Sequence, residues 1–387
     1  MNDFHARSGR WAADPGFGVY VHIPFCRHRC HYCDFNTYEG QEALHAAYVD
    51  ALVRHIEESP GEARSVTSIF FGGGTPTLLS VRDLGRILEA VRNRMDVSSG
   101  AEVTVEANPE TVTEATFEAL LAAGFNRFSI GVQSLAPHVL RGLGRTHSAG
   151  RALDAIADAR RAGVTDLNAD LIFGSPWERP GDWVASLAAL VDLGPEHVSA
   201  YALTVEQGTP LATLVRTGRV PNVDPDVQAD RYSTAGEVLG AAGYERYEVS
   251  NWTRPGHASR HNVLYWSAGD YLGFGAGAHG HMAGRRSWAV RLPRHYVDAV
   301  GSGEVEEGHE VLTPGERAGE ALALGLRLAS GIEVAGFTTR FGDAALADRA
   351  TDLDRLEAAN LLNRSNGHIR ISGWATLLGN EVIAALL

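Results

Sequence analysis

The sequence predicts an α/β protein: a partial barrel of six strand–helix units, followed by a small, mainly α-helical domain of winged-helix type. Three observations support this fold class. Short apolar, β-branched runs recur about every thirty residues between residues 17 and 205, an interval typical of parallel βα units. The segments between these runs carry apolar residues at three- and four-residue spacing, which indicates amphipathic helices. Helical patterns return after residue 313, where a short strand or hairpin precedes a last helix.

The strands and helices of the barrel are expected to alternate along the chain. The apolar runs place the strands at 18–23, 68–74, 102–108, 127–134, 166–174 and 197–204. The helical spacing places the covering helices at 44–58, 81–95, 113–124, 149–163 and 182–194. Ligands of parallel α/β folds bind at the carboxyl ends of the strands. The polar and glycine-bearing residues that follow these strands are therefore expected to form the site.

The whole chain is expected to divide into four segments. These are a flexible N-terminal tail, the partial barrel, a barrel-closing segment and a C-terminal winged-helix-like domain, at residues 1–16, 17–215, 216–312 and 313–387. The third segment predicts a helix at 226–242 and glycine-rich loops at 271–281 over the barrel mouth. Winged helices often bind DNA, but residues 333–387 carry five Arg and seven acidic residues. That balance favours a structural or lid role over a nucleic-acid surface.

Charge and composition exclude several classes of protein. The formal net charge of -13 argues against nucleic-acid binding, because that affinity depends on clustered Lys and Arg. No stretch approaches the roughly 18 consecutive apolar residues of a membrane helix, and residues 1–16 lack the apolar run of a secretory signal. We therefore expect a cytoplasmic protein with no integral membrane segment and no nucleic-acid partner.

One short loop, "HIPFCRHRCHYCDFN", holds every cysteine of the chain together with three histidines: Cys26, Cys30, Cys33, His22, His28 and His31. The cysteines lie too close together to form a disulfide framework for a chain of this length. Three thiolates and one histidine could complete a tetrahedral zinc site. Alternatively, three thiolates could bind three irons of a [4Fe-4S] cluster and leave the fourth iron open to a ligand. The polar neighbours of the cysteines argue against a third interpretation, ordinary core residues.

The cysteine spacing CxxxCxxC after the first predicted strand resembles the signature of the radical S-adenosylmethionine (radical SAM) enzymes. "GGGTPT" after the second strand and "GVQS" after the fourth extend this resemblance to the oxygen-independent coproporphyrinogen III oxidase group. The resemblance implies that Cys26, Cys30 and Cys33 bind a [4Fe-4S] cluster whose open iron is chelated by S-adenosylmethionine. It also implies an electron donor such as a flavodoxin or ferredoxin, since reductive cleavage of the cofactor consumes an electron.

The same resemblance implies a set of residues around S-adenosylmethionine, all near the carboxyl ends of strands. They are Tyr20, Tyr32, Gly73, Gly74, Thr75, Glu106, Gln133, Arg145 and Asp170. Glycines suit close backbone approach to a ligand because they carry no Cβ. Taken singly, each of the polar residues is compatible with a helix cap or a surface ion pair. Together, their placement after successive strands favours one convergent site.

Two features distinguish the subgroups that share this core: the residues after the third cysteine and a motif at 261–266. The oxidases carry a fourth cysteine two residues after the third, whereas here Cys33 is followed by Asp34 and Phe35, as in HemW-type haem chaperones. "HNVLYW" at 261–266 also matches the HNxxYW motif of that group. The match implies that His261 offers an imidazole to haem iron and that Tyr265 and Trp266 offer flat surfaces to the porphyrin. "GSPWERPGDW" after the fifth strand departs from the GLPGQT-like run expected there.

The sequence thus favours a HemW-like haem chaperone that binds haem and transfers it to haem-requiring proteins, respiratory enzymes among them. Its expected cofactors and cargo are the [4Fe-4S] cluster, S-adenosylmethionine and haem. One alternative is an oxygen-independent coproporphyrinogen III oxidase, which forms protoporphyrinogen IX by oxidative decarboxylation. The other is a zinc-stabilised binding module. Whether the protein is an enzyme stays open at this point, and no residue is assigned a catalytic role.

Overall fold

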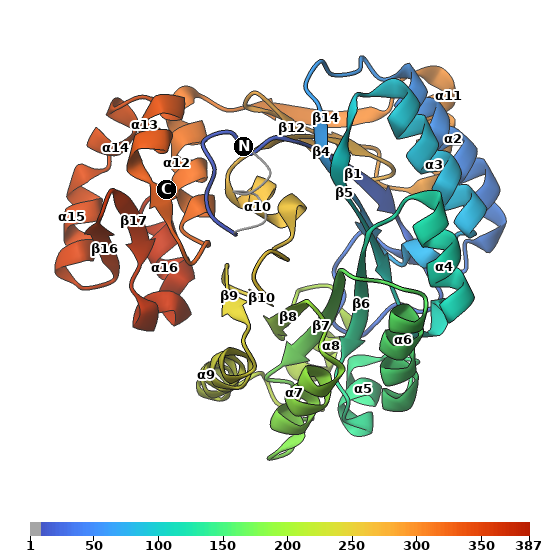
Figure 1. Cartoon of the computed structure of the whole chain (residues 1–387), viewed down its shortest axis with the longest axis horizontal. Helices are drawn as coiled ribbons and strands as arrows, with labels where there is room; N and C mark the ends of the chain where they lie inside the picture. Colours follow the sequence, from blue (N-terminus) through green and yellow to red (C-terminus); the bar gives the residue numbers. More distant parts are fainter. Residues whose placement is uncertain (1–8) are drawn as a thin grey trace.

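The computed structural model describes residues 9–387 and shows a curved sheet with helices on its outer face (Figure 1). The sheet has twelve strands in the order β14-β13-β12-β11-β1-β4-β5-β6-β7-β8-β10-β9. Residues 1–8, the first half of the expected tail, lie outside the described part. Within residues 9–387, none of the helices combines the length and the apolar composition that a membrane crossing requires.

Six neighbouring parallel strands form the centre of the sheet, as the sequence predicts. They are β1 (Phe17–Ile23), β4 (Val66–Gly73), β5 (Val97–Ala107), β6 (Arg127–Gln133), β7 (Leu167–Phe173) and β8 (His197–Ala202). Alternate residues face opposite sides of a strand. Val19 and Val21 of β1 are buried in the main core, whereas the intervening Tyr20 lies with Phe70 on the opposite face, inside the barrel. The barrel interior carries many polar side chains, and those side chains build the site.

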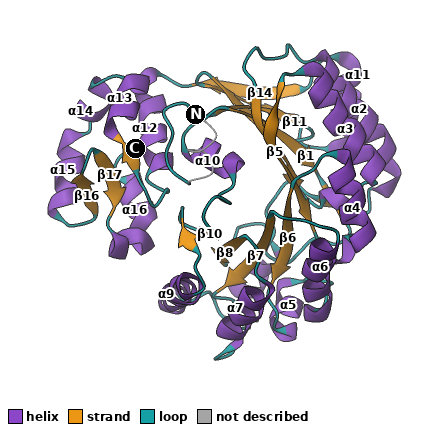
Figure 2. Cartoon of the chain, in the orientation of Figure 1, coloured by secondary structure: helices purple, strands orange, loops and turns teal. Residues whose placement is uncertain are grey.

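Helices cover the convex face of these strands (Figure 2). The predicted ones are α2 (His45–Glu58), α3 (Val81–Arg94), α4 (Glu114–Ala123), α6 (Ala149–Arg161), α7 (Asp182–Leu193) and α9 (Pro225–Ala241). Their ends follow the expected chemistry: the Ser80 hydroxyl accepts from Asp83 N at the start of α3, and Gly124 ends α4 in the left-handed region. Between β6 and α9, two seven-residue helices were not predicted, α5 (Pro137–Leu143) and α8 (Pro210–Arg216); each spans too few residues to show helical periodicity.

The glycine-rich stretch expected as loops over the mouth instead extends the sheet. It contributes β11 (Asp270–Phe274) and β12 (His279–Met282), which continue into β13 (Arg285–Ala289) and β14 (Glu306–Val311). β11 pairs in parallel with β1, and Tyr20 is opposite Gly273. A Cβ at Gly273 would collide with the carbonyl oxygen of His279. The glycine therefore permits close approach of two strands, and glycine content misled the loop prediction.

A short helix, α10 (Arg260–Trp266), closes the amino end of the barrel and holds the HNxxYW motif. The Glu102 carboxylate on β5 accepts hydrogen bonds from the backbone N–H groups of Arg260 (2.9 Å) and His261 (3.1 Å) and from the Ser259 hydroxyl (3.2 Å). The chain reaches this point through β9 (Glu245–Arg246) and β10 (Asn251–Thr253), which end the sheet beside β8. The motif is thus at the end of the barrel opposite the cysteine loop, which follows β1.

The C-terminal part is mostly helical and has its own core. Its elements are α12 (Pro314–Gly325), α13 (Val334–Phe341), α14 (Ala344–Ala347), α15 (Ala350–Ala358), α16 (Gly379–Ala384) and the small sheet β15 (Ile332–Glu333), β17 (His368–Ile371), β16 (Leu362–Ser365). It is joined to the barrel by α11 (Pro293–Ser302) and β14. Trp11, within the expected tail, is buried in this core beside Phe337. α12 also contacts α10, so the helical part adjoins the amino end of the barrel.

Candidate functional site

The cysteine loop begins where β1 ends and is fixed to several parts of the barrel. β2 (Phe25–Cys26) pairs with β3 (Tyr38–Glu39) across the base of the loop. His31 N donates to the carbonyl of Leu143 at 3.0 Å, which ties the loop to the end of α5. On the barrel side, His22 Nε2 donates to the carbonyl of Asn36 at 3.0 Å, and its Nδ1 accepts from the Tyr20 hydroxyl at 2.8 Å. The loop therefore has a defined position before any ligand binds.

The three thiols open into one cavity at the carboxyl ends of the strands, and this cavity has a volume of about 410 Å³. The predicted cofactor residues that line it are Tyr32, Gly73, Gly74, Thr75, Glu106, Gln133, Arg145 and Asp170. Tyr20 does not line the cavity; it lies deeper, between Phe70 and His22. The structure thus brings together residues from five strand ends that are far apart in the sequence.

Each cysteine sulfur has a polar neighbour. The Thr75 hydroxyl donates to Cys26 Sγ at 3.8 Å, Arg145 Nη1 donates to Cys30 Sγ at 3.5 Å, and Cys33 Sγ is 4.0 Å from the Thr37 hydroxyl. Burial, and after it the neighbouring thiols, raise the pKa of Cys26 to about 11. Bare thiolates are therefore unfavourable here, and a bound metal would supply the missing positive charge.

The donor set fits an iron–sulfur cluster. A cluster places each cysteine on a different iron, so the sulfurs need not converge on one point. Among residues 9–387, no group of three or more His, Cys, Asp or Glu side chains is gathered as a single metal ion would require. The hydrogen bonds to the sulfurs are of the kind that orient cluster ligands and tune the metal. His28 pairs with Glu39 (3.4 Å) instead of turning toward the thiols.

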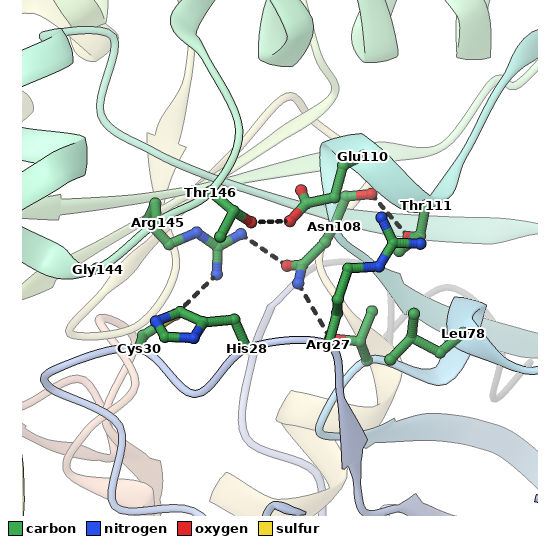
Figure 3. Close-up of a pocket in the computed structure, with 11 residues that line it drawn as sticks. Arg27, His28, Cys30, Leu78, Asn108, Glu110, Thr111, Gly144, Arg145 and Thr146 are labelled. Atoms are coloured by element: carbon green, nitrogen blue, oxygen red, sulfur yellow. Dashed lines mark hydrogen bonds between the residues drawn. The ribbon is translucent and has the colours of Figure 1, made fainter. Parts of the chain in front are cut away.

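Arg145 and Asn108 connect the cysteine loop to the loops after β5 and β6 (Figure 3). Arg145 Nη2 donates to Asn108 Oδ1 at 2.7 Å and to the carbonyl of Gly131 at 3.0 Å. Asn108 Nδ2 in turn donates to the Thr75 hydroxyl at 3.0 Å. Sequence reasoning did not single out Asn108, although it lies in "EANPE" directly after the third predicted strand. A polar amide at a strand's carboxyl end was the available signal.

Two partly buried carboxyls lie on the inner wall of the cavity. Burial, and then the proximity of Asp170, raise the pKa of Glu106 to about 8; Glu106 accepts from Gly73 N at 3.1 Å. Asp170 accepts from Ser129 (2.9 Å) and Asn168 (2.8 Å), and burial raises its pKa as well. These groups can take a proton or an extra cation at little cost. The wall therefore suits a positively charged ligand.

Gln133 ends β6 with a left-handed backbone, φ 64°. Its side-chain Oε1 is buried and accepts no hydrogen bond from any described residue. An orphaned buried acceptor is costly unless a ligand or water donates to it. Gln133 thus marks a place in the cavity for a ligand that carries a hydrogen-bond donor.

Substitution of Gly74 tests how closely the backbone after β4 packs against the cysteine loop. A Cβ there would lie 2.5 Å from the carbonyl oxygen of Phe25, so the backbone of the cysteine loop would have to move. We expect Gly74→Ala to lower the free energy of unfolding by about 1–3 kcal/mol. Gly85 in α3 is the matched control, because its nearest neighbour would be Ala123 Cβ at 3.8 Å. Gly85→Ala should raise stability by about 0.5–1 kcal/mol. Urea denaturation of both variants measures the difference, and equal responses would contradict it.

The segment "GSPWERPGDW" after β7 has a packing role. Trp177 packs with the apolar cluster beneath α5 and α8, and a Cβ at Gly142 would collide with its indole ring. The Trp183 indole N–H donates to the carbonyl of Arg231 at 2.9 Å, which ties α7 to α9. The segment that departs from the expected run thus contributes to the packing beneath the cavity.

The residues of the HNxxYW motif have different surroundings in the structure. Tyr265 and Trp266 line a second cavity between α10, β11–β13 and the helices α12 and α13. His261 is 1 % exposed and does not line that cavity. Its ring stacks on Phe70 (centroids 5.2 Å apart), and its Nδ1 is 3.0 Å from the Ser68 hydroxyl. Burial lowers the pKa of His261 to about 3, so the ring is neutral.

Comparisons with known proteins agree with this geometry. Residues 20–220 match the model of the radical SAM superfamily, and residues 312–378 match the HemN C-terminal domain. The chain is 41% identical over 377 residues to "Heme chaperone HemW" of Mycobacterium tuberculosis, covering 96% of this chain and 95% of that one. It is 34% identical over 374 residues to "Heme chaperone HemW" of Bacillus subtilis, covering 95% and 98%.

A solved structure shows the same fold. Coproporphyrinogen III oxidase (HemN) from Escherichia coli superposes with a TM-score of 0.83 at 21% identity, over 98% of this chain and 92% of the other. At this identity the likeness concerns the fold alone. The full-length matches to HemW proteins, the CxxxCxxC loop and the cavity behind it agree on one family. The chain belongs to the radical SAM superfamily and, within it, to the HemW family.

Proposed function

We propose that the protein is a haem chaperone, which binds haem and passes it to haem-requiring proteins. The observation that carries this proposal is the similarity, over nearly the whole chain, to proteins of that name. The second cavity supports it independently, because aromatic and cationic side chains meet there. Respiratory haem enzymes are the acceptors we propose, and the cytoplasm is the compartment, since free cysteines remain reduced there.

The first cavity is proposed to hold the cluster and S-adenosylmethionine. Cys26, Cys30 and Cys33 would bind the cluster, which supplies an electron for cleavage of the sulfonium when it is reduced. The backbone of Gly73 and Gly74 leaves room for the methionine part of the cofactor. Glu106 faces the same space as an acceptor and counter-charge. A flavodoxin or ferredoxin is the proposed electron donor.

The oxidase alternative rests on the shared fold and lacks a specific feature of this chain. Cys33 is followed by Asp34 and Phe35, and no fourth cysteine exists to complete the oxidase motif. Anaerobic protein with reductant and S-adenosylmethionine should leave coproporphyrinogen III unchanged. Formation of protoporphyrinogen IX would favour the oxidase.

Haem transfer is the direct test of the proposal. The reconstituted full-length protein should bind hemin in a one-to-one complex with a shifted Soret band. When mixed with a haem-free acceptor enzyme, it should lose this band as the acceptor gains haem and activity. Free hemin at the same concentration is the control. A wild-type protein that gives no Soret change would contradict the proposal.

The binding of S-adenosylmethionine should depend on pH through Glu106. Because its pKa is raised to about 8, the carboxyl is mostly neutral at pH 7 and becomes anionic as the pH rises. An anion attracts the sulfonium cation, so binding expels the proton and affinity increases with pH. Between pH 7 and 8.5 we expect a rise of about five- to tenfold. Calorimetric titration at several pH values measures it.

Glu106→Gln is the control for this prediction. The amide cannot ionise, so the variant should lose that part of the pH dependence. The amino group of the ligand titrates identically with both proteins, and the difference between them isolates Glu106. Equal pH profiles would show that Glu106 does not face the cofactor.

A further inference from the structure

We propose that the second cavity holds haem with His281 as the iron ligand and with Arg317 and Arg340 as partners of the two propionates. This inference rests on the proposed haem-chaperone function and assigns the ligand contacts to residues outside the HNxxYW motif. The cavity has a volume of about 280 Å³, close to the lower limit of the roughly 300–1,000 Å³ of small-molecule sites. Its lining residues come from α10, from β11–β13 and from the C-terminal helices α12 and α13, and Figure 1 shows α10 between the sheet and these helices.

His281 has the hydrogen bonding of a metal-ligating histidine. Its Nδ1 is 3.2 Å from Asp270 Oδ1 and 3.4 Å from the carbonyl of Gly269. Both partners are acceptors, so Nδ1 carries the proton and Nε2 is left with its lone pair. Nε2 has no hydrogen-bond partner among residues 9–387. A carboxylate behind the opposite nitrogen is the usual way in which proteins orient an imidazole toward a metal.

Asp270 is anchored independently of any ligand. Although burial would raise the pKa of Asp270, hydrogen bonds from His281, Ala283 N and Arg64 hold it well below its ordinary value. Arg64 donates to Asp270 at 2.8 Å. The carboxylate therefore stays ionised and fixes the tautomer of His281.

The cavity is cationic. Arg286, Arg317 and Arg340 line it, and Glu320 is the one acidic side chain among the lining residues of the described part of the chain. Arg286 is paired with that glutamate at 3.1 Å. Arg340 donates to the backbone carbonyls of Ser267 and Ala268, and it makes no direct ion pair with a carboxylate of residues 9–387. Burial is the main reason that the pKa of Arg340 is lowered. Asp270 and Asp14 offset this burial only in part and without direct contact, so a carboxylate ligand that contacts the guanidinium would stabilise it.

Arg317 makes no ion pair with any side chain of residues 9–387. It is half-buried at the cavity wall beside Arg340, and the two guanidiniums repel each other. Two guanidiniums that lack a directly paired carboxylate among residues 9–387 match a ligand with two carboxylates. The two propionates of haem meet that requirement.

The remaining walls suit a flat ring system. Tyr265, Trp266, Tyr271 and Phe341 contribute aromatic surface. The indole Nε1 of Trp266 is buried without an acceptor among the described residues, so a ligand carboxylate would also satisfy this donor. His261 remains behind Tyr265, with ring centroids 4.6 Å apart, and supports the wall from inside the barrel.

A comparison of hemin with metal-free protoporphyrin IX distinguishes ligation of the iron from contacts with the propionates. We expect His281→Ala to weaken hemin binding by about tenfold and to return its Soret band toward that of free hemin. Protoporphyrin IX has no iron, and its affinity should not change. Added imidazole should restore the Soret band of His281→Ala. His279→Ala is the matched control, because His279 lies on the same strand, is exposed and does not line the cavity.

Arg317→Ala should lower the affinity for both hemin and protoporphyrin IX by roughly tenfold. Arg317→Lys should recover part of this affinity. An unchanged Soret band in His281→Ala, or a loss confined to His261→Ala, would overturn the assignment while haem binding itself stands. A wild-type protein that binds no hemin would overturn the proposed function instead. Circular dichroism confirms that each variant is folded.

Discussion

Replacing Cys30 by serine should give a folded protein that holds no [4Fe-4S] cluster. Cys30 contributes one of three sulfurs, and the chain has no other cysteine to replace it. Two thiolates would leave half of the irons without protein ligands, and a serine hydroxyl is a poor substitute for a thiolate. After anaerobic reconstitution, iron content and the absorbance and EPR signals of the cluster should fall to background.

The fold should survive this change. Cys30 is only partly buried, and its loop is held by backbone hydrogen bonds that do not involve the thiol. Arg145 loses its 3.5 Å contact with sulfur but keeps Asn108 and the carbonyl of Gly131. We therefore expect the free energy of unfolding of the cluster-free chain to change by less than about 1 kcal/mol.

His28→Ala is the matched control within the same loop. His28 is half-exposed and pairs with Glu39, an interaction worth about 0–1 kcal/mol at the surface. This variant should bind a full cluster. If His28→Ala lost its metal as Cys30→Ser does, a mixed cysteine–histidine site, such as zinc, would be favoured over the cluster.

The sequence predicted the barrel well because its signals are local. Each parallel strand is an apolar run flanked by turn residues, and each covering helix shows helical periodicity. The cavity at the cysteine loop was predictable for a related reason. Parallel strands end at one edge, so Glu106 and Asp170 were expected to meet once their strands were identified, and both line the cavity. Asn108 was missed because a single amide after a strand is a common feature.

The second half of the chain was harder to predict because its structure depends on long-range pairing. The glycines at 271–281 suggested loops, yet Gly273 is needed where β11 approaches β12 and pairs with β1. Nothing near residue 261 in the sequence indicates that Glu102 caps α10 from a distant strand. The cationic cavity combines residues of α10, β11, β12, β13, α12 and α13, and no local motif contains them all.

His261 illustrates the limit of a motif. The match to HNxxYW favoured the imidazole as a haem contact, whereas the structure places it in a continuous set of contacts inside the barrel. The ring stacks on Phe70, Phe70 stacks on Tyr20, and the Tyr20 hydroxyl binds His22 beside the cysteine loop. His261 thus lies between the two cavities. A change at His261 would alter the packing around both cavities. The proposed haem test therefore relies on His281, with His279 on the same strand as its control.

Replacing Glu102 by alanine should strongly destabilise the amino end of the barrel. The carboxylate is buried, and it accepts from Arg260 N, His261 N and the Ser259 hydroxyl. Alanine would leave these buried donors without an acceptor and would remove the negative charge near Arg127. We expect a loss of about 3–5 kcal/mol in the free energy of unfolding. Urea denaturation of the cluster-free chain measures it.

Glu102→Gln separates charge from shape in the same experiment. The amide fills the same space and keeps one acceptor oxygen, but its NH₂ group faces a donor, so the loss should be about 1–2 kcal/mol. Glu118→Ala on the exposed face of α4 is the control and should stay within about 0.5 kcal/mol of wild type. Hydrogen exchange should locate the effect of Glu102→Ala in α10. If the amides of α10 exchanged as slowly as in wild type, Glu102 could not be what holds this helix in the barrel.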